Sequence, residues 1–356
     1  MAQSPGSAAT PSAAPEPEER EPVPLRRLRP SSWAYAGRRA IHGFVVNNAL
    51  DSAATLTYYA VLAVAPSLLV VLSLLGLVGA SAPSADLLRE LLHGLVPEES
   101  IQLLTPLMVS LARSPRSGWP LVIGAAGAIW SVSNYISAFS RATNRIYQVA
   151  EGRRTGWLRV QHMLFAVAAL TLLSLVLLAV VSGTPLAARA MQVADLSPAL
   201  TRQLLGFQAP VLIAAVLMLV NLLFFATPNV RKFQFRVLSP GSLVAIAAWA
   251  LSSWALAEYL SSFFVLDPTY GTLGGVVLFL LWGYVGNCAM LFGAELDAGL
   301  ERAQELQAGL PAEVQLQVPP RHSEQIVINR WSERRLEKRG RAIREAAERR
   351  RREEPD

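Results

Sequence analysis

The sequence predicts an all-α fold: a polytopic membrane helix bundle with about six transmembrane helices. Only 16% of its 356 residues are charged, whereas soluble domains average ~25%. Charged residues are also absent from six long runs, and each run reaches the ~20 residues that an apolar helix needs to cross a bilayer. A soluble core rarely needs even one such run. The charge-free runs are 52–84, 117–140, 160–188, 203–230, 237–257 and 268–294.

The apolar centres of these runs give the expected membrane-spanning segments, and the rest of the sequence divides around them. Residues 1–30 contain seven prolines and predict a disordered tail. Residues 31–50 mix aromatic side chains with arginines, which favours an amphipathic helix at the membrane surface. The membrane domain is then 51–298, and 299–356 is a charged, arginine-rich tail. The spans are predicted near 56–78, 119–138, 163–181, 210–225, 243–260 and 274–292.

The loops between the spans differ in positive charge, and this difference predicts an orientation. Arginine and lysine crowd the approach to the first span, the loops after the second and fourth spans, and the segment after the sixth. The other three loops carry fewer of them. Because basic loops stay on the cytoplasmic side, both termini are expected in the cytoplasm. An even number of crossings requires the same arrangement, so we expect a multi-pass protein of a cell membrane.

Two segments outside the spans have helical patterns of their own. Leucines recur at helical spacing within residues 86–113, which predicts amphipathic helices on the outer face. Residues 330–352 predict a charged helix that either contacts anionic lipid headgroups or is simply solvated. The glutamates interleaved among its arginines weaken its positive field and favour the solvated tail.

Polar residues cluster where the first span enters the membrane. Asn47, Asn48 and Asp51 are the members of this cluster. Polar groups are costly in lipid and usually face protein or water. The cluster is therefore either a vestibule on a substrate route or an entry region whose polar groups are satisfied by headgroups and neighbouring helices.

The first two spans also carry aromatic and polar side chains near their centres. Tyr58 and Tyr59 precede Pro66, which removes a helix hydrogen bond. The resulting kink suits a gated cavity, although kinks are common in membrane helices. In the second span Trp130 and Asn134 share a helical face with several serines. Hydrogen bonding between helices is favoured over substrate contact for this polar stripe.

Glycines interrupt the helical pattern just before the sixth span. Tyr270, Gly271, Gly274 and Gly275 either expose backbone to a ligand or form a tight turn followed by close helix packing. Asn287, further along the same span, is another candidate for the lining of a substrate path.

A carboxylate, Glu295, lies near the cytoplasmic end of the sixth span. An acid in this position can relay protons, but an ion pair with a basic residue such as Arg145 is favoured. The chain has four histidines, and none has a neighbour at metal-ligand spacing. We therefore expect neither a metal site nor a cofactor.

Four blocks of the sequence carry motifs in a characteristic order. They are Asn47-Asn48, Asp51, Leu56-Thr57-Tyr58-Tyr59-Ala60 and Ala65-Pro66; Trp130-Ser131, Asn144-Arg145-Ile146-Tyr147 and Arg153-Arg154; Pro228-Asn229, Pro240-Gly241 and Trp249; and Tyr270-Gly271-Thr272-Leu273-Gly274-Gly275, Leu281-Trp282, Asn287 and Gly293-Ala294-Glu295-Leu296. Together they resemble the YihY/BrkB family of bacterial inner-membrane proteins over about residues 35–302. The resemblance implies an integral membrane protein for which transport of an envelope component is suspected.

The resemblance also implies an older label, a tRNA-processing ribonuclease, which the residues do not support. Phosphodiester hydrolysis uses clustered carboxylates or histidines, usually around metal ions, and the sequence offers no such cluster. We expect no enzyme activity and no nucleic-acid partner. The favoured function is a transporter or translocation factor for a lipid or another envelope component, with membrane lipids as partners and homo-oligomerisation open. The alternative is a non-transporting scaffold that recruits partners through its basic tail.

Overall fold

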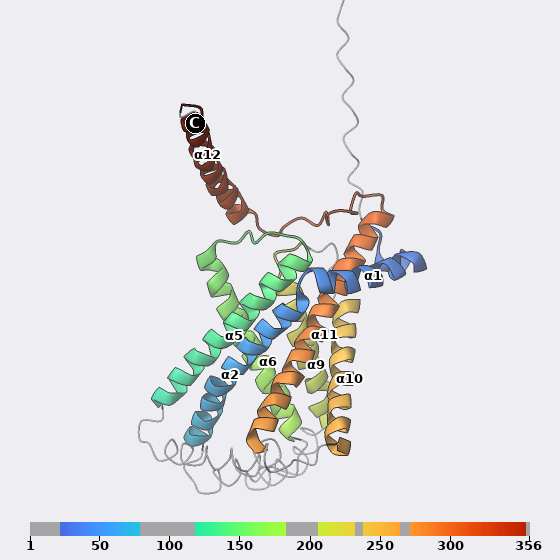
Figure 1. Cartoon of the computed structure of the whole chain (residues 1–356). Helices are drawn as coiled ribbons and strands as arrows, with labels where there is room; N and C mark the ends of the chain where they lie inside the picture. The colour runs from blue at the N-terminus through green and yellow to red at the C-terminus, as the bar shows by residue number, and fades with distance from the viewer. Residues whose placement is uncertain (1–21, 79–117, 183–205, 232–237, 264–270, 354–356) are drawn as a thin grey trace, which may run out of the picture.

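The computed structural model describes residues 22–78, 118–182, 206–231, 238–263 and 271–353, and its regular elements there are all helices (Figure 1). The helix α2 (Ala49–Val78) is 30 residues long, and its segment Ala49–Val64 is apolar. With the other five it makes the membrane bundle that the sequence predicts. Those five are each long and apolar enough to span a membrane: α5 (Gly118–Ile146), α6 (Thr155–Ser182), α9 (Gln208–Asn221) with the π-helical turn η2 (Leu222–Ala226), α10 (Pro240–Phe263) and α11 (Gly271–Gln307).

Both ends of the described chain lie at the same end of the bundle (Figure 1). The helix α1 (Pro30–Val46) lies across α11 there, and α12 (Glu324–Glu353) projects away from the bundle. The crossing of α1 and α11 is close, because a Cβ atom on Gly299 would lie 2.8 Å from the carbonyl oxygen of Ala36. We call this end, which bears α1 and α12, the terminal end. An even number of crossings places both chain ends on one side, as observed.

The packed structure extends beyond the expected membrane domain at both ends of the chain. Before α1, the Gln304 amide donates to the carbonyl of Val23 at 2.7 Å, and Leu28 is buried. After α11, the chain folds back and buries Leu316 and Val318 in the core. The part of the C-terminal tail that stands clear of the bundle is α12. The outer amphipathic helices expected within 86–113 lie outside the described residues.

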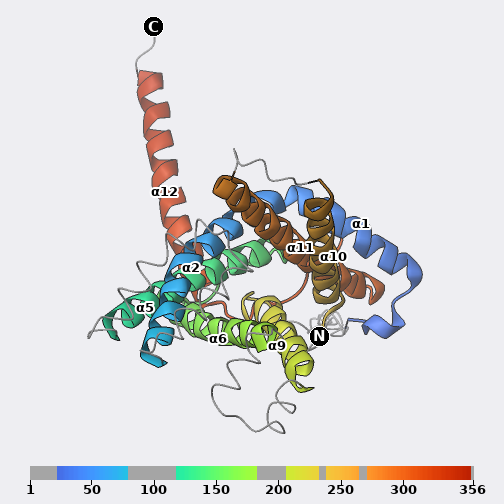
Figure 2. The same cartoon turned by 90° about the horizontal axis from the view of Figure 1, so that it is seen from below.

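The six bundle helices follow one another around an incomplete ring (Figure 2). Close neighbours run in the order α10, α11, α2, α5, α6 and α9. In the described part of the chain, α9 and α10 make little contact with each other, so the ring has a seam between them. Aromatic packing fills the interior, with the rings of Phe139 and Phe224 5.9 Å apart.

The start of α10 is fixed against α11 by two glycines and a carboxylate. A Cβ atom on Gly241 would meet the backbone oxygen of Gly293, and one on Gly293 would meet that of Gly241, so neither position has room for a side chain. Asp297 Oδ1 accepts a hydrogen bond from the Gly241 amide at 2.8 Å. A carboxylate at a helix N-terminus satisfies an unpaired N–H and complements the helix dipole. These contacts give the Pro240-Gly241 motif a structural role.

Candidate functional site

A cavity of about 330 Å³ lies among the six bundle helices. Its volume falls within the ~300–1,000 Å³ that small-molecule sites occupy. The lining residues of α2, α5, α6, α10 and α11 lie near the middle of those helices, whereas those of α9 and η2 lie toward the terminal end. The cavity therefore sits near mid-depth in the bundle, where transporters commonly place their binding sites. Its lining is almost entirely apolar. The lining residues are Ala60, Ala63, Val132, Tyr135, Ile136, Ala169, Leu170, Leu173, Leu219, Val220, Leu223, Trp249, Gly283, Gly286, Asn287 and Met290.

One wall of the cavity carries a directed chain of hydrogen bonds across three helices. The Tyr135 hydroxyl donates to Asn287 Oδ1 at 2.8 Å, and Asn287 Nδ2 donates to Thr57 Oγ1 at 3.0 Å. The Thr57 hydroxyl in turn donates to the carbonyl of Ala53 at 2.8 Å. An amide in the membrane interior is costly unless it is paired, so this chain ties α5, α11 and α2 together at the cavity.

A second wall presents an indole with no hydrogen-bond partner. Trp249 Nε1 is buried and makes no hydrogen bond to the described residues. It packs tightly against Gly286, where an added Cβ atom would lie 2.6 Å from the nitrogen. The Trp249 ring lies 5.4 Å from that of Trp282, whose own Nε1 donates to Ser253 Oγ at 2.8 Å. A buried indole N–H usually finds a partner, so Trp249 offers a donor to a polar group of a bound molecule.

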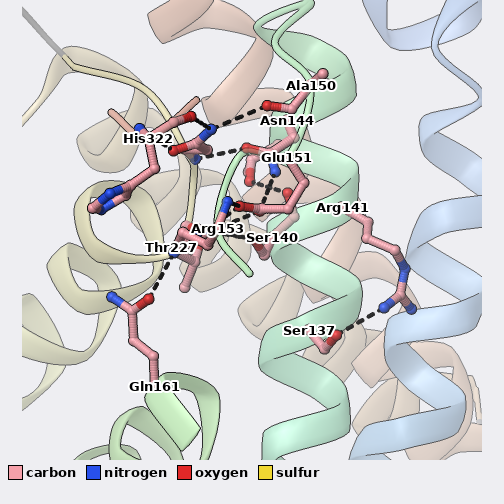
Figure 3. Close-up of polar contacts among 12 residues, drawn as sticks. Ser137, Ser140, Arg141, Asn144, Ala150, Glu151, Arg153, Gln161, Thr227 and His322 are labelled. Carbon is pink, nitrogen blue, oxygen red and sulfur yellow. Dashed lines mark hydrogen bonds and ion pairs between the residues drawn. The ribbon is translucent and has the colours of Figure 1, made fainter. Parts of the chain in front are cut away.

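The terminal end of the bundle is held by a buried arginine (Figure 3). Arg153 is 3% exposed and donates two side-chain hydrogen bonds of 2.8 Å to the Glu151 carboxylate. Its Nη2 also donates to the carbonyl of Thr227 at 2.8 Å, just after the π-helical turn. Burial alone would raise the pKa of the Glu151 carboxyl, but the hydrogen bonds and charge of Arg153 hold that pKa below its ordinary value. The Glu151 carboxyl is therefore favoured in its ionised form.

Two asparagines extend this arginine cluster to the segment after α11 (Figure 3). Asn144 donates to Glu151 Oε2 at 2.9 Å and accepts from the Asn229 amide at 2.7 Å. The Asn229 side chain bonds the backbone of His322 in both directions, at 2.9 Å each. This end therefore joins α5 and the loop after it to two segments distant in the sequence, the one after η2 and the one before α12.

The polar cluster at the start of the first span forms the joint between α1 and α2. Asn48 has a φ of 52°, a left-handed conformation that asparagine adopts more readily than most residues. Asn47 Nδ2 donates to Glu295 Oε1 at 2.7 Å, while Arg145 Nη1 donates to the Asn47 carbonyl at 3.3 Å. Glu295 and Arg145 therefore share Asn47 in place of the expected direct ion pair. Asp51 lies exposed in the first turn of α2.

The other candidates of the first two spans lie on or near the bundle surface. Tyr58 is exposed and packs edge-on against Tyr59 at 5.5 Å, and Tyr59 is half-buried against the core. Pro66 lies within α2, close to Gly127 of α5. Neither tyrosine lines the cavity.

The polar stripe of the second span meets an arginine of the third. Arg159 Nη1 donates to Asn134 Oδ1 at 2.8 Å, so Asn134 does bond across helices. The Arg159 guanidinium carbon lies 4.1 Å from the centre of the Trp130 ring.

The glycine-rich segment before the sixth span is described only in part. Gly271, Gly274 and Gly275 lie in the first turns of α11, which begins at Gly271. Tyr270 lies outside the described residues. Asn287 is the one candidate of the sixth span that lines the cavity.

Sequence reasoning missed most of the cavity. Tyr135 and Trp249 carry polar groups of its lining, and Thr57 bonds the lining residue Asn287, but only helix register brings these residues together. The sequence did carry one signal: Gly283 and Gly286 lie three residues apart in α11. Such a pair of small residues marks a helix face where neighbours either approach closely or leave space. Within the described residues, no three histidine, cysteine, aspartate or glutamate side chains gather as a metal site would require.

Comparison with known proteins gives the chain its family. The family described as virulence factor BrkB matches residues 40–315. A ribonuclease-like protein, YfkH, of Bacillus subtilis is 24% identical over 74% of this chain and 94% of its own length. A UPF0761 membrane protein of Rhodospirillum centenum is 30% identical, and the match covers 74% of this chain but only 56% of that relative. No solved structure matches. The chain is a multi-pass bacterial membrane protein and belongs to the BrkB family.

Proposed function

We propose that the protein is a transporter or translocation factor for a lipid or another envelope molecule that carries an alkyl chain. The observation that supports this proposal is the cavity at mid-depth in the bundle. Its apolar lining suits an alkyl chain, because such a chain can occupy it without burying a polar group that lacks a hydrogen-bond partner. A cavity of this size is unusual in a helix bundle with a purely structural role, because protein interiors pack as densely as organic crystals.

Two polar features of the cavity favour an amphipathic occupant over a purely apolar one. The Trp249 N–H is available to an acceptor such as an ester carbonyl oxygen. The hydrogen-bond chain from Tyr135 through Asn287 to Thr57 adds a hydroxyl and an amide among the lining residues. Few but fixed polar groups in an apolar pocket are typical of sites that orient a ligand.

We expect such a molecule to enter from the bilayer at the seam between α9 and α10. Lining residues come from both helices, with Leu219 and Val220 on α9 and Trp249 on α10. These helices make little contact with each other in the described part of the chain. A lipid that enters sideways keeps its alkyl chain in an apolar environment throughout.

The proposal is tested by lipid translocation in reconstituted liposomes. Fluorescent phospholipids in the outer leaflet are bleached by a membrane-impermeant reductant, and protein-mediated exchange raises the bleached fraction above one half. Ala169→Phe fills the cavity from α6 and should abolish most of the exchange. Ala168→Phe, on the adjacent exposed position of the same helix, is the matched control and should leave it unchanged. Equal exchange in wild type, both variants and protein-free liposomes would count against transport of these lipids.

A second candidate function, a scaffold that recruits partners, is favoured by the exposure of α12. Its apolar side chains stand in solvent, with Trp331 56% and Ile343 72% exposed. Arg335 lies 3.5 Å over the Trp331 ring, so the helix carries a mixed basic and aromatic surface. Deleting residues 324–356 removes α12 and keeps the packed segment before it. A scaffold loses its cellular function on this deletion while liposome exchange persists, whereas a transporter without a recruiting role keeps both.

A further inference from the structure

The helix α1 lies at the edge of the bundle, outside α11, and its outward surface has two different sides (Figure 2). The surface toward α11 is made of small buried residues, Ala36, Ala40 and Gly43. Ile41 and Val45 lie four residues apart and so share a helix face, and they are 63% and 70% exposed. Arg38 and His42 are also four residues apart and are exposed. We call these pairs the apolar side and the basic side of α1.

An aromatic contact fixes the direction in which the apolar side faces. Phe44 follows Ile41 by three residues and is therefore its neighbour on the helix surface. The Phe44 ring lies 5.9 Å from the ring of Phe292. Phe292 comes seven residues before Gly299, the point where α1 crosses α11, on the part of α11 that runs down into the bundle (Figure 1). The apolar side therefore faces toward the bilayer interior.

The basic side faces the opposite way, toward the terminal end. Arg39 precedes His42 by three residues and is its neighbour on the helix surface. The charge of Arg39 acts on Arg302, which lies three residues beyond Gly299 toward the end of α11. One outward side of α1 thus points to lipid and the other to the aqueous side of the membrane.

The joint at the end of α1 lies at the level where two membrane-spanning helices leave the hydrocarbon. Glu295 is the first charged residue after the charge-free run 268–294, and it accepts a hydrogen bond from Asn47 at 2.7 Å. Arg145, one residue before the end of α5, donates to the carbonyl of Asn47 at 3.3 Å. Since charges are costly in hydrocarbon, both partners of Asn47 mark the membrane boundary.

The basic side lies within the headgroup layer above this boundary. Gly43 lies against Glu295, and Ala36 lies against Gly299, so Arg38 lies at a level between these two residues of α11. Four residues of helix rise ~6 Å at 1.5 Å each. The headgroup regions add ~5–8 Å to each side of the hydrocarbon core, which matches this height.

The composition of this surface complements an anionic membrane. Residues 22–50 contain five arginines and neither aspartate nor glutamate. Guanidinium groups match phosphate oxygens in geometry and charge. Trp33 and Tyr35 of the same helix are 41% and 37% exposed, and tryptophan and tyrosine are enriched at membrane–water interfaces.

We propose that α1 lies in the plane of the membrane surface and binds the anionic phospholipids of the leaflet at the terminal end. Ile41 and Val45 enter the acyl-chain region, while Arg38 and His42 donate hydrogen bonds to headgroup phosphates. An apolar face in the lipid beside a basic face is the arrangement of interfacial helices. The surface is outside the bundle and separate from the cavity, so it does not depend on the proposed transport.

The first test measures the depth of the two sides in nanodiscs of phosphatidylcholine and phosphatidylglycerol. Spin labels are placed on Ile41→Cys, Val45→Cys or Arg38→Cys of the full chain, with the native Cys288 replaced by serine. Labels at 41 and 45 should collide more with oxygen than with a water-soluble nickel chelate, and the label at 38 should do the reverse. Ile343→Cys, 72% exposed on α12, is the aqueous control. Labels at 41 and 45 that match this control would overturn the proposal and leave the apolar side to a protein partner.

The second test measures lipid preference by native mass spectrometry of the detergent-solubilised full chain. Wild type should bind phosphatidylglycerol more tightly than phosphatidylcholine, and Arg38→Gln should reduce this preference about fivefold, the ratio that corresponds to roughly 1 kcal/mol per basic residue near an anionic surface. Arg341→Gln, an exposed arginine of α12, is the matched control and should keep the preference.

The lipid measurement contradicts the proposal if Arg38→Gln keeps the full preference, or if Arg341→Gln loses as much, since net charge alone would then explain the binding. Complete displacement of phosphatidylglycerol by excess inorganic phosphate would assign the basic side to a soluble anion instead. The depth test uses other variants, so it still decides if Arg38→Gln fails to fold.

Discussion

Replacing Arg153 with methionine should destabilise the protein by about 3 kcal/mol, at the lower end of the ~3–5 kcal/mol seen when one partner of a buried ion pair is removed. The lower end applies because the Glu151 side chain is 28% exposed, so water partly solvates its orphaned charge. The Thr227 carbonyl also keeps one donor, the Ser140 hydroxyl at 2.8 Å. Methionine preserves most of the side-chain volume, so the loss reports the polar contacts and not a cavity.

The measurement is the free energy of unfolding in mixed micelles, from a graded titration with a denaturing detergent followed by far-ultraviolet circular dichroism. Arg154→Met is the matched control, because its neighbouring side chain is exposed and surface changes stay within ~0.5 kcal/mol. Adding Glu151→Gln to Arg153→Met should recover part of the loss, since no buried charge is then left unpaired. The reasoning fails if Arg153→Met is no more harmful than Arg154→Met.

Three further predictions concern charge, close packing and the α1–α2 joint. Because the pKa of Glu151 is lowered from 4.5 in the folded protein, its stabilising contribution is complete above that value and is lost as pH falls through the lowered pKa. The melting temperature of wild type should accordingly fall more steeply in acid than that of Glu151→Gln. Gly299→Ala should destabilise by about 1–3 kcal/mol, because its Cβ atom would lie 2.8 Å from a backbone oxygen, whereas Gly37→Ala has open space and should stabilise α1 by up to ~1 kcal/mol; equal melting temperatures for the two variants would contradict the packing at Gly299. Asn48→Gly should preserve both stability and lipid exchange, since glycine accepts a positive φ; lost exchange in a stable variant would show that the Asn48 side chain serves the substrate route instead.

The spans could be predicted from the sequence because lipid imposes one strong rule along the chain. Charged groups are costly in hydrocarbon, so their absence marks each crossing regardless of tertiary contacts. The same rule does not give the end of the helix that contains the sixth span. Glu295 interrupts the charge-free run, yet α11 continues to Gln307 because its polar residues pair with α1 and the loops. A hydropathy pattern registers the acidic residue Glu295 but not the Asn47 side chain that pairs with it.

The candidate site was harder to predict, because it depends on which helix faces meet. Asn287 was singled out as a polar residue in a span, and it does reach the cavity. Its partners Tyr135 and Thr57 come from two other helices, and no spacing in the sequence joins them. Asn134 and Tyr135 are adjacent in the chain, but successive helical positions point in different directions, so Asn134 bonds Arg159 while Tyr135 turns inward. Register between helices decides which of two neighbouring polar residues lines the cavity.

The terminal end of the bundle is closed by packed residues. There the Arg153 cluster and the segment from Leu316 to His322 fill the space between α5, α6 and the end of α9 with paired polar groups and buried apolar side chains. A soluble substrate approaching from that side would have to break charge-assisted hydrogen bonds, each stronger than a neutral one. An alkyl chain entering between α9 and α10 breaks none of them. If the protein transports a molecule as proposed, sideways entry breaks fewer of these bonds, and a substrate that already resides in the bilayer can use it.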